Sequence, residues 1–354
     1  MKREALRRAR RVVVKIGSST LARDDAAYDR LATAIRAQKD AKRQVVLVSS
    51  GAIALGWKKL GYRARPKEMA KLQASAAAGQ SVLMRNYEEA FVRAGLPVAQ
   101  VLLTHADLAD RVRANNAREA MVALLEAGAV PILNENDSVA VDEIKFGDND
   151  ELSAMVTSLV AADVLVLLSD VEGLLDGEGE RIPLVRDVEK DALPFVRAKK
   201  SDVGTGGMAS KIEAARRATL AGAWVVIADA RKDDVIERIF AGEDEGTAFA
   251  PSERRLGAKK HWIAFTLRPR GTLLLDAGAT HAVCTKGKSL LAVGVLGVRG
   301  DFRAADSVRL VADNGAEIGR GLARCSSAEA VLVAGKKEED DDHVLVHRDE
   351  LVVW

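Results

Sequence analysis

The chain is poor in aromatic residues (4%) and in histidine, and it contains only two cysteines. Cys284 and Cys325 alone predict neither a disulfide framework nor a cysteine-based metal site. Lys and Arg (53) nearly balance Asp and Glu (51), so the net charge of +2 favours neither nucleic acid nor an acidic membrane as partner. No apolar run approaches the roughly 20 residues that span a bilayer. We therefore expect a soluble, cytoplasmic protein without a membrane partner.

The first 240 or so residues alternate short β-branched runs with longer helical patterns. Several runs are apolar almost throughout, as expected for parallel strands covered on both faces. The predicted strands are residues 11–16, 44–48, 97–103, 129–133, 163–168 and 223–228, and the predicted helices are residues 28–42, 67–94, 115–127, 151–161 and 210–221. This alternation predicts an α/β fold with a mostly parallel sheet sandwiched by helices.

The pattern changes after residue 240. Residues 242–260 are polar and rich in glycine and charge, which indicates a linker or domain edge. Beyond them, short β-rich runs at residues 272–275, 291–298, 307–311, 331–333 and 344–346 predict a small, mostly-β barrel-like module. At the other end, residues 1–11 hold six basic residues against Glu4, and we expect this arm to be solvated.

The richest polar segment is NENDSVAVDEIKFGDNDE, residues 134–151, with seven carboxylates and three asparagines. It directly follows the apolar run at 129–133, a predicted buried strand. In open α/β sheets, ligands bind in the crevice beyond the carboxyl ends of the strands. The segment therefore predicts a site for a polar ligand.

Three glycine-containing turns offer anion sites. Lys15 and Gly17 end the first predicted strand, where a fixed cation and free backbone N–H groups suit a phosphate, although an exposed lysine on a turn explains the pattern equally well. Ser50 and Gly51 lead into a helix whose start can hold an anion, and an ordinary serine N-cap explains them nearly as well. The third turn, GTGGMASK, ends at Lys211 one turn inside a helix.

The third turn also has two rival interpretations. It is not a Walker A loop, and the nearest approach to one, around Lys288, has Ala282 where the first glycine belongs. Gly204, Gly206 and Ala209 partly fit the dinucleotide fingerprint. That fingerprint requires an apolar strand immediately upstream, whereas residues 196–202 are polar and basic.

Two lysines on glycine-rich turns, with carboxylates to orient them, suit phosphoryl transfer, which depends on positioning and on cations around the transferred group. None of the five histidines lies inside these motifs. A carboxylate acceptor with a pKa near 4.3 is already ionised at neutral pH and needs no general base. The pattern therefore favours a kinase that forms an acyl phosphate.

The stretches VVVKIGSS, VLVSSGAIALG, PILNENDSVA, EIKFGDNDELSA, LLSDVEGL and VGTGGMASK, in this order over residues 12–211, closely resemble the glutamate 5-kinases of the amino acid kinase superfamily. The region that follows resembles the PUA domain of many bacterial members. The resemblance implies a catalytic domain at residues 1–255 and a PUA-like domain at residues 262–354. It also implies that ATP phosphorylates the γ-carboxylate of L-glutamate to L-glutamyl 5-phosphate, the first step of proline biosynthesis.

The same resemblance implies roles for individual residues. Lys15 and Lys211 would bind the transferring phosphoryl group, and Asp150 would orient both lysines. Ser50, Asp137 and Asn149 would bind glutamate. The residues that would bind ATP are Lys15, Ser169, Asp170, Thr205, Gly206, Gly207, Met208, Ala209, Ser210 and Lys211.

The resemblance further implies Mg²⁺ as cofactor, with no protein ligand assigned, feedback inhibition by proline, a dimer or tetramer, and glutamyl-phosphate reductase as a partner. The chain departs from the family pattern at Leu175, where a tyrosine is common, and residues 176–183 lack a usual Asn-Pro loop. The resemblance therefore does not indicate which residues near 171–183 would contact the adenine ring.

Two alternatives remain. The same fold with another acceptor would be an aspartate, N-acetylglutamate or UMP kinase; the NEND and GDND motifs together with a PUA-like module argue for free glutamate. A PUA-like fold could instead bind RNA. Residues 259–354 hold 14 basic and 13 acidic residues, a net of +1, which argues against that interpretation for the module as a whole. A local stripe through Arg299, Arg303, Arg309 and Arg320 keeps it open.

Overall fold

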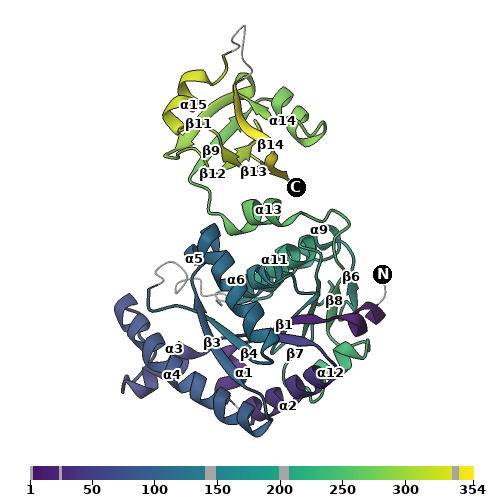
Figure 1. Cartoon of the computed structure of the whole chain (residues 1–354). Coiled ribbons are helices and arrows are strands. Elements are labelled where there is room, and N and C mark those ends of the chain that lie inside the picture. The colour runs from purple at the N-terminus through teal and green to yellow at the C-terminus, as the bar shows by residue number, and fades with distance from the viewer. Residues whose placement is uncertain (1–2, 24–25, 140–148, 199–206, 337–342) are drawn as a thin grey trace. The chain divides into compact units, whose positions relative to one another are not determined.

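The computed structural model describes residues 3–23, 26–139, 149–198, 207–336 and 343–354. The chain forms two compact units, Met1–Arg255 and Leu256–Trp354, each with a sheet of its own (Figure 1). The segment expected to be a linker contains the boundary between the units. It also contains a fully buried strand, β8 (Thr247–Phe249), so the linker is shorter than its composition suggested.

The first unit is built on one sheet, which in the described part of the chain has eight strands in the order β3-β4-β2-β1-β5-β7-β8-β6. All pairings are parallel except that between β7 and β8. The strands are β1 (Arg11–Ile16), β2 (Gln44–Ser49), β3 (Val98–Leu103), β4 (Val130–Glu135), β5 (Val164–Ser169), β6 (Leu184–Val185), β7 (Trp224–Asp229) and β8. Six of these match the predicted strands to within two residues, and the predicted fold class is confirmed.

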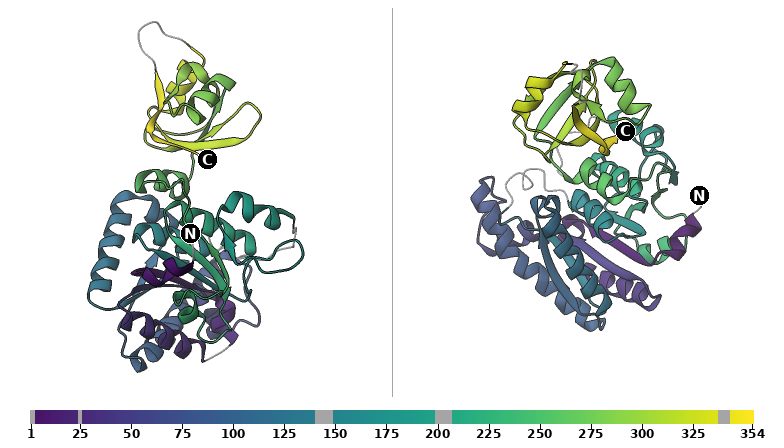
Figure 2. Two further views of the ribbon diagram at one scale, coloured as in Figure 1. Left: turned by 90° about the vertical axis from the view of Figure 1, so that its right-hand side faces the viewer. Right: turned by 45° about the horizontal axis from the view of Figure 1, so that its top comes forward.

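Helices cover both faces of this sheet (Figure 2). Because strand side chains alternate between faces, Val12 and Val14 of β1 join one core while Val13 joins the other. The first core includes α2 (Ala27–Asp40), α4 (Met69–Arg93) and α12 (Val235–Phe240). The second includes α5 (His105–Ala109), α6 (Arg111–Glu126), α8 (Asn149–Leu159) and α11 (Met208–Leu220).

The first unit also contains a close helix pair and several short helices. Helix α3 (Ala52–Lys59) packs directly on α4, backbone against backbone. The remaining short helices are α1 (Ser18–Arg23), α9 (Val188–Asp191) and α10 (Leu193–Ala198).

The described residues of the second unit form a six-stranded sheet in the order β10-β14-β13-β12-β9-β11, with a core of its own. The strands are β9 (Gly271–Leu275), β10 (Leu290–Leu291), β11 (Val295–Gly300), β12 (Ser307–Val311), β13 (Glu317–Ala323) and β14 (Val344–Val353), with helices α13 (Ala258–His261), α14 (Ala277–Cys284) and α15 (Ser327–Val333). The predicted strand at residues 331–333 is wrong. A capping box between Ser326 and Glu329 starts α15 there instead.

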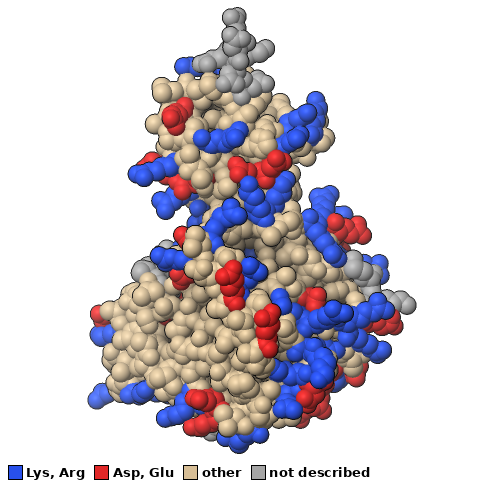
Figure 3. All heavy atoms as spheres, in the orientation of Figure 1, with Lys and Arg blue, Asp and Glu red and all other residues tan. Residues whose placement is uncertain are grey.

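Basic and acidic side chains are interspersed over the visible face of the second unit (Figure 3). Arg309 and Arg320, adjacent across β12 and β13, both contact the carboxylate of Glu317 at 3.6 and 2.9 Å. Arg320 also lies over the ring of Trp354. Two of the four arginines in the proposed stripe are thus engaged within the unit. Among the described residues of the whole chain, no helix is long and apolar enough to cross a membrane.

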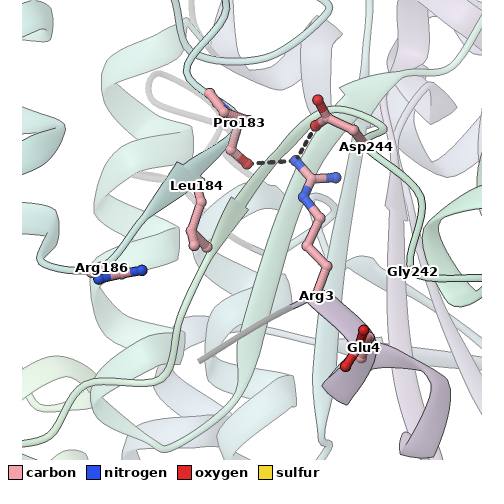
Figure 4. A pocket seen from close by; sticks show the side chains of 7 residues that line it. All are labelled: Arg3, Glu4, Pro183, Leu184, Arg186, Gly242 and Asp244. Atoms are coloured by element: carbon pink, nitrogen blue, oxygen red, sulfur yellow. Dashed lines mark hydrogen bonds and ion pairs between the residues drawn. The ribbon is translucent and has the colours of Figure 1, made fainter.

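The N-terminal arm is not merely solvated, as its composition suggested. Residues Arg3–Arg8 form the 3₁₀-helix η1, with Leu6 fully buried. The Arg3 guanidinium donates to the carbonyl oxygens of Glu243 and Gly246 at 2.9 and 2.7 Å and pairs with Asp244 at 3.1 Å. Figure 4 shows the ion pair with Asp244 at a pocket of about 360 Å³ beside β6. Arg3 therefore fastens the start of the chain to the loop that precedes β8.

Candidate active site

Two buried lysines from distant parts of the chain meet at one buried carboxylate. The Nζ atom of Lys15 lies 2.5 Å from Asp150 Oδ1, and the Nζ atom of Lys211 lies 3.2 Å from Asp150 Oδ2. Asp150 is fully buried, and the two lysines expose only 6% and 4% of their surface. Burial of three charges is favourable only when they are paired this closely. The structure thus brings together the three residues predicted to be catalytic.

The fold explains this convergence. Lys15 lies next to the end of β1 and, by strand alternation, on the same face as Val13, which is covered by α8 and α11. Asp150 lies in the first turn of α8, and Lys211 in the first turn of α11. The two helices pack side by side on that face. The N-termini of both helices therefore lie beside the carboxyl end of β1. Their free backbone N–H groups favour binding of an anion there.

Electrostatics keep this carboxylate ionised. Burial alone would raise the pKa of Asp150, but the charges of Lys15 and Lys211 and the hydrogen bonds that the carboxylate accepts together outweigh it, and the pKa lies below its ordinary value. Hydrogen bonds from Lys15 and from Ser210, whose hydroxyl donates to Oδ2 at 2.9 Å, act in the same direction. One negative charge thus faces two positive ones, which gives these three residues a net positive charge toward an arriving phosphate.

A cluster of amides lies on the other side of β1, toward β2 and β4. Asn149 Nδ2 donates to Ser50 Oγ at 2.7 Å, to the Ser49 carbonyl at 3.0 Å and to Asn134 Oδ1 at 3.1 Å. Asn134 Nδ2 in turn donates to Gln80 Oε1 on α4 at 2.9 Å. Three acceptors around one nitrogen fix the orientation of the Asn149 amide. Its Oδ1 is buried and has no hydrogen-bond partner among the described residues.

The other predicted acceptor-binding residue, Asp137, lies half-buried in the turn that follows β4, three residues beyond Asn134. The structure thus brings Ser50 and Asn149 into direct contact and places Asp137 at the end of the neighbouring strand. The rest of the GDND segment before Asn149 lies outside the described residues.

The predicted nucleotide residues lie on the opposite side of β1, at the end of β5. Ser169 is buried and Asp170 is exposed, and their side chains approach to 3.2 Å. The segment after Asp170 is tied to β8, because Leu174 N donates to Thr247 Oγ1 at 2.9 Å. Gly173 permits this contact: its φ is +151°, and a Cβ at this position would lie only 2.5 Å from Thr247 Oγ1, which leaves no room for a side chain.

The predicted ATP-binding turn is described from Gly207 onward. Gly207 precedes α11, Met208, Ala209 and Ser210 form its first turn, and Ser210 also donates to the Gly207 carbonyl at 2.8 Å. Thr205 and Gly206 lie outside the described residues.

Sequence reasoning missed several residues that border the site. Asn134 belongs to the NEND motif and could have been chosen from it, but Gln80 is one of several polar residues in an alanine-rich helix, with nothing in its local pattern to mark it. Asp229 and Arg231 were also missed as a pair. A buried aspartate ending a hydrophobic strand, followed two residues later by arginine, is the signal that could have found them.

The described residues contain no group of three His, Cys, Asp or Glu side chains arranged to hold a metal ion. Both oxygens of Asp150 already face lysines, so this carboxylate does not fit the role of a metal ligand. The pocket beside β6 is lined by Arg3, Pro183 and their neighbours and by none of the predicted site residues.

Comparison with known proteins agrees with this geometry. Residues 10–229 match the amino acid kinase family, and residues 271–345 match the PUA domain. Full-length relatives include "Glutamate 5-kinase" of Trichlorobacter lovleyi, 45% identical over 100% of this chain and 99% of the relative. The protein of the same name from Pelobacter propionicus is 42% identical over 100% of both chains, and that of Ralstonia pickettii is 45% identical over 98% and 97%.

The chain therefore belongs to the amino acid kinase family and, within it, to the group of glutamate 5-kinases. It is a kinase that carries a PUA domain, and the predicted family and enzyme class are confirmed.

Proposed function

We propose that this kinase transfers the γ-phosphoryl group of ATP to the γ-carboxylate of L-glutamate, giving L-glutamyl 5-phosphate and ADP in the first step of proline biosynthesis. The observation that carries the proposal is the pair of buried lysines, 15 and 211, held on the single carboxylate of Asp150. The names of the full-length relatives supply the acceptor.

The transfer needs charge neutralisation and alignment more than acid–base chemistry. A γ-carboxylate oxygen of glutamate attacks the terminal phosphorus, a new P–O bond forms, and the bond to the β,γ-bridging oxygen breaks, leaving its electron pair on ADP. No proton moves at neutral pH, because the attacking carboxylate is already ionised. Lys15 and Lys211 would bind the equatorial oxygens, and Asp150 would keep both ammonium groups aimed at one point.

The acceptor would lie toward β2 and β4. Ser50 and Asn149 are in contact there, and the unpartnered Oδ1 of Asn149 is suited to accept a hydrogen bond from the ammonium group of an amino acid. Asp137, at the end of β4, would bind the same end of the substrate, and Ser50 would donate to a carboxylate oxygen.

The nucleotide would lie toward β5 and β7. Gly207 and the first turn of α11, with Met208, Ala209 and Ser210, offer backbone N–H groups to the phosphates, and we extend this role to Thr205 and Gly206. Ser169 and Asp170 would contact the nucleoside portion. Mg²⁺ would enter bound to the ATP phosphates, since such ions often keep water and few protein ligands; it would lower the charge of the triphosphate.

The remaining parts of the proposal concern regulation and assembly. We propose a catalytic domain at residues 1–255 and a PUA-like domain at residues 262–354, with proline as a feedback inhibitor whose site overlaps that of glutamate. A cytoplasmic dimer or tetramer that passes its labile product to glutamyl-phosphate reductase completes the proposal.

The test is a hydroxamate assay in which hydroxylamine traps the acyl phosphate formed from ATP. Glutamate, aspartate and N-acetylglutamate are compared as acceptors, ADP release is followed with UMP, and the glutamate reaction is repeated with proline. Turnover with glutamate, reduced by proline, is expected. Preferential turnover of another acceptor would replace glutamate, and glutamate turnover that proline leaves unchanged would remove the proposed inhibition.

A further inference from the structure

Arg231 and Asp229 form a polar pair at the end of β7, beside the predicted nucleotide residues. Arg231 Nε and Nη2 donate to the Asp229 carboxylate at 2.8 and 2.6 Å, and Nη2 also donates to the Asp170 carbonyl at 3.1 Å. Asp229 exposes only 4% of its surface, whereas the Arg231 side chain remains 66% exposed. The guanidinium is thus anchored along one edge and open to solvent.

The sheet places this pair on the same face and at the same edge as Lys15, whose proposed role is to bind the transferring phosphoryl group. Asp229 lies directly opposite Ser169 in the β5–β7 ladder, and by alternation it shares a face with Lys15. The strand order β1-β5-β7 puts the pair two strand spacings, roughly 10 Å, from Lys15 across the sheet, and the register places Asp229 two residues further along the strands. The acceptor side lies in the opposite direction, on β2 and β4. A nucleotide whose terminal phosphate reaches Lys15 and Lys211 would therefore extend its nucleoside over the ends of β5 and β7.

The chemistry of Arg231 suits a base better than a phosphate. Its positive charge is already matched by a bidentate carboxylate at close range, which weakens any pull on a further anion. The same carboxylate fixes the plane of the guanidinium, so little side-chain entropy is lost when an aromatic ring stacks on it. A fixed, exposed guanidinium plane is a platform for an aromatic ring.

We propose that Arg231, fixed in place by Asp229, is a nucleotide-contacting residue on which the purine base of ATP stacks. This inference rests on the proposed function for the identity of the nucleotide and of the transfer centre. The inference gives a role to Arg231 and Asp229, which lie outside the family motifs found in the sequence.

The test compares Arg231→Ala and Arg231→Lys with the wild-type chain. Arg93→Ala is the matched control, because Arg93 also pairs with an aspartate at 2.6 Å, in the same unit and at an exposed position. Steady-state KM values are measured for ATP and for glutamate, and the inhibition constant is measured for inorganic tripolyphosphate. Direct titration of ATP without glutamate gives its Kd.

Loss of a stacked platform should raise the KM and Kd for ATP about three- to tenfold in both Arg231 variants, since lysine keeps the charge but lacks the plane. The KM for glutamate and the inhibition constant for tripolyphosphate should remain as in the wild type, as should all values in Arg93→Ala. An unchanged KM for ATP in Arg231→Ala would overturn the inference. So would full rescue by lysine together with a weaker tripolyphosphate interaction in Arg231→Ala, which would indicate a phosphate contact.

The readouts separate this inference from the proposed function. Wild-type chain that binds ATP but phosphorylates no glutamate would contradict the proposed function, and the Kd for ATP would still decide the role of Arg231. A merely structural role would disturb glutamate and ATP alike, or lower thermal stability without a selective change in KM, and either result would overturn the inference.

Discussion

At the scale of single residues, the cluster of Lys15, Asp150 and Lys211 holds two positive charges for one negative charge. One buried carboxylate is shared by two buried ammonium groups, one on each of its oxygens. Because a single negative charge is divided between two cations, each lysine remains partly available to a phosphate, while the shared aspartate prevents the two cations from separating.

Lys211→Ala should remove one of the two cations at the transferring phosphoryl group. We expect kcat to fall about 10³-fold, within the range known for cations that stabilise such transition states. The fold should persist because Asp150 keeps its 2.5 Å contact with Lys15. Turnover in the hydroxamate assay is the measurement, with Lys190→Ala, an 80% exposed lysine, as control. Near-normal kcat would refute the role.

Asp137→Ala should act on binding rather than on chemistry. Removing a contact made equally in the ground and transition states raises KM and leaves kcat nearly unchanged. We expect the KM for glutamate to rise about tenfold, roughly the loss of one charged contact, and the KM for ATP to stay constant. Steady-state kinetics with each substrate varied in turn is the measurement. An unchanged KM for glutamate would move Asp137 out of the site.

Asp150→Asn should make stability less sensitive to acid. Because the pKa of Asp150 lies below its ordinary 3.8, its contribution to stability is fully present above about pH 5 and is lost as pH falls through the folded-state pKa. Breaking this buried network should cost about 3 kcal/mol at pH 7. Urea unfolding of both proteins from pH 7 to pH 3 measures the difference, which should shrink toward the acid end. A difference that is constant over this range would contradict the assignment.

Residue patterns could point to Lys15 and Lys211 because each lies at the end or the beginning of a regular element, next to a glycine-containing turn. The resemblance to the glutamate 5-kinases was needed to choose Asp150 among the seven carboxylates of its segment. Gln80 could not be predicted in this way, because its importance comes from a tertiary contact with Asn134. Arg231 pairs with Asp229 two residues earlier, a local signal that was present in the sequence but lay outside the recognised motifs. A polar residue in a helix looks the same in sequence whether it faces solvent or a site.

At the scale of elements, helices α3 and α4 approach unusually closely. A Cβ on Gly79 would lie 1.8 Å from the Ala52 carbonyl oxygen, and one on Gly56 would lie 1.7 Å from that of Ser75. Helix α3 follows Ser50, and α4 carries Gln80, which contacts Asn134. We therefore expect a change in the spacing between these helices to move Ser50 and Asn134 relative to each other.

Gly79→Ala should separate the two helices. In an open helical position this change stabilises by about 1 kcal/mol, but here overpacking should destabilise by about 1–3 kcal/mol and raise the KM for glutamate more than that for ATP. Gly257→Ala is the control, since its Cβ would meet nothing within 4 Å and it lies outside the predicted binding segments. Thermal unfolding and KM values decide the outcome, and a stabilised Gly79→Ala with unchanged KM would contradict this explanation.

Hydrophobic periodicity predicted the six parallel strands, and five of them are buried almost throughout on both faces, whereas β3 is only partly buried. It missed β6 and β8, which are only two and three residues long, and it mistook the helix at Ser327–Val333 for a strand. Three consecutive apolar residues do not distinguish a strand from a helical turn, and the preceding capping box was the decisive signal.

At the scale of the whole molecule, the second unit should bind RNA weakly if at all. Arg309 and Arg320 are engaged by Glu317, and the net charge over residues 259–354 is only +1. In filter binding of the full chain to a mixed-sequence RNA, we expect weak retention at low salt and a shallow dependence on salt. Tight binding that falls steeply with salt would contradict this expectation and assign a phosphate-contacting surface to the chain.

The shared carboxylate has a consequence for biosynthesis of the chain itself. Residues 15 and 211 are separated by most of the first unit, so a nascent polypeptide exposes the first lysine long before the second has been translated. Until then Lys15 and Asp150 have been synthesised but Lys211 has not, so the three-residue cluster is incomplete. The three charged residues can therefore meet only after the N-terminus of α11 has been synthesised and has packed beside α8.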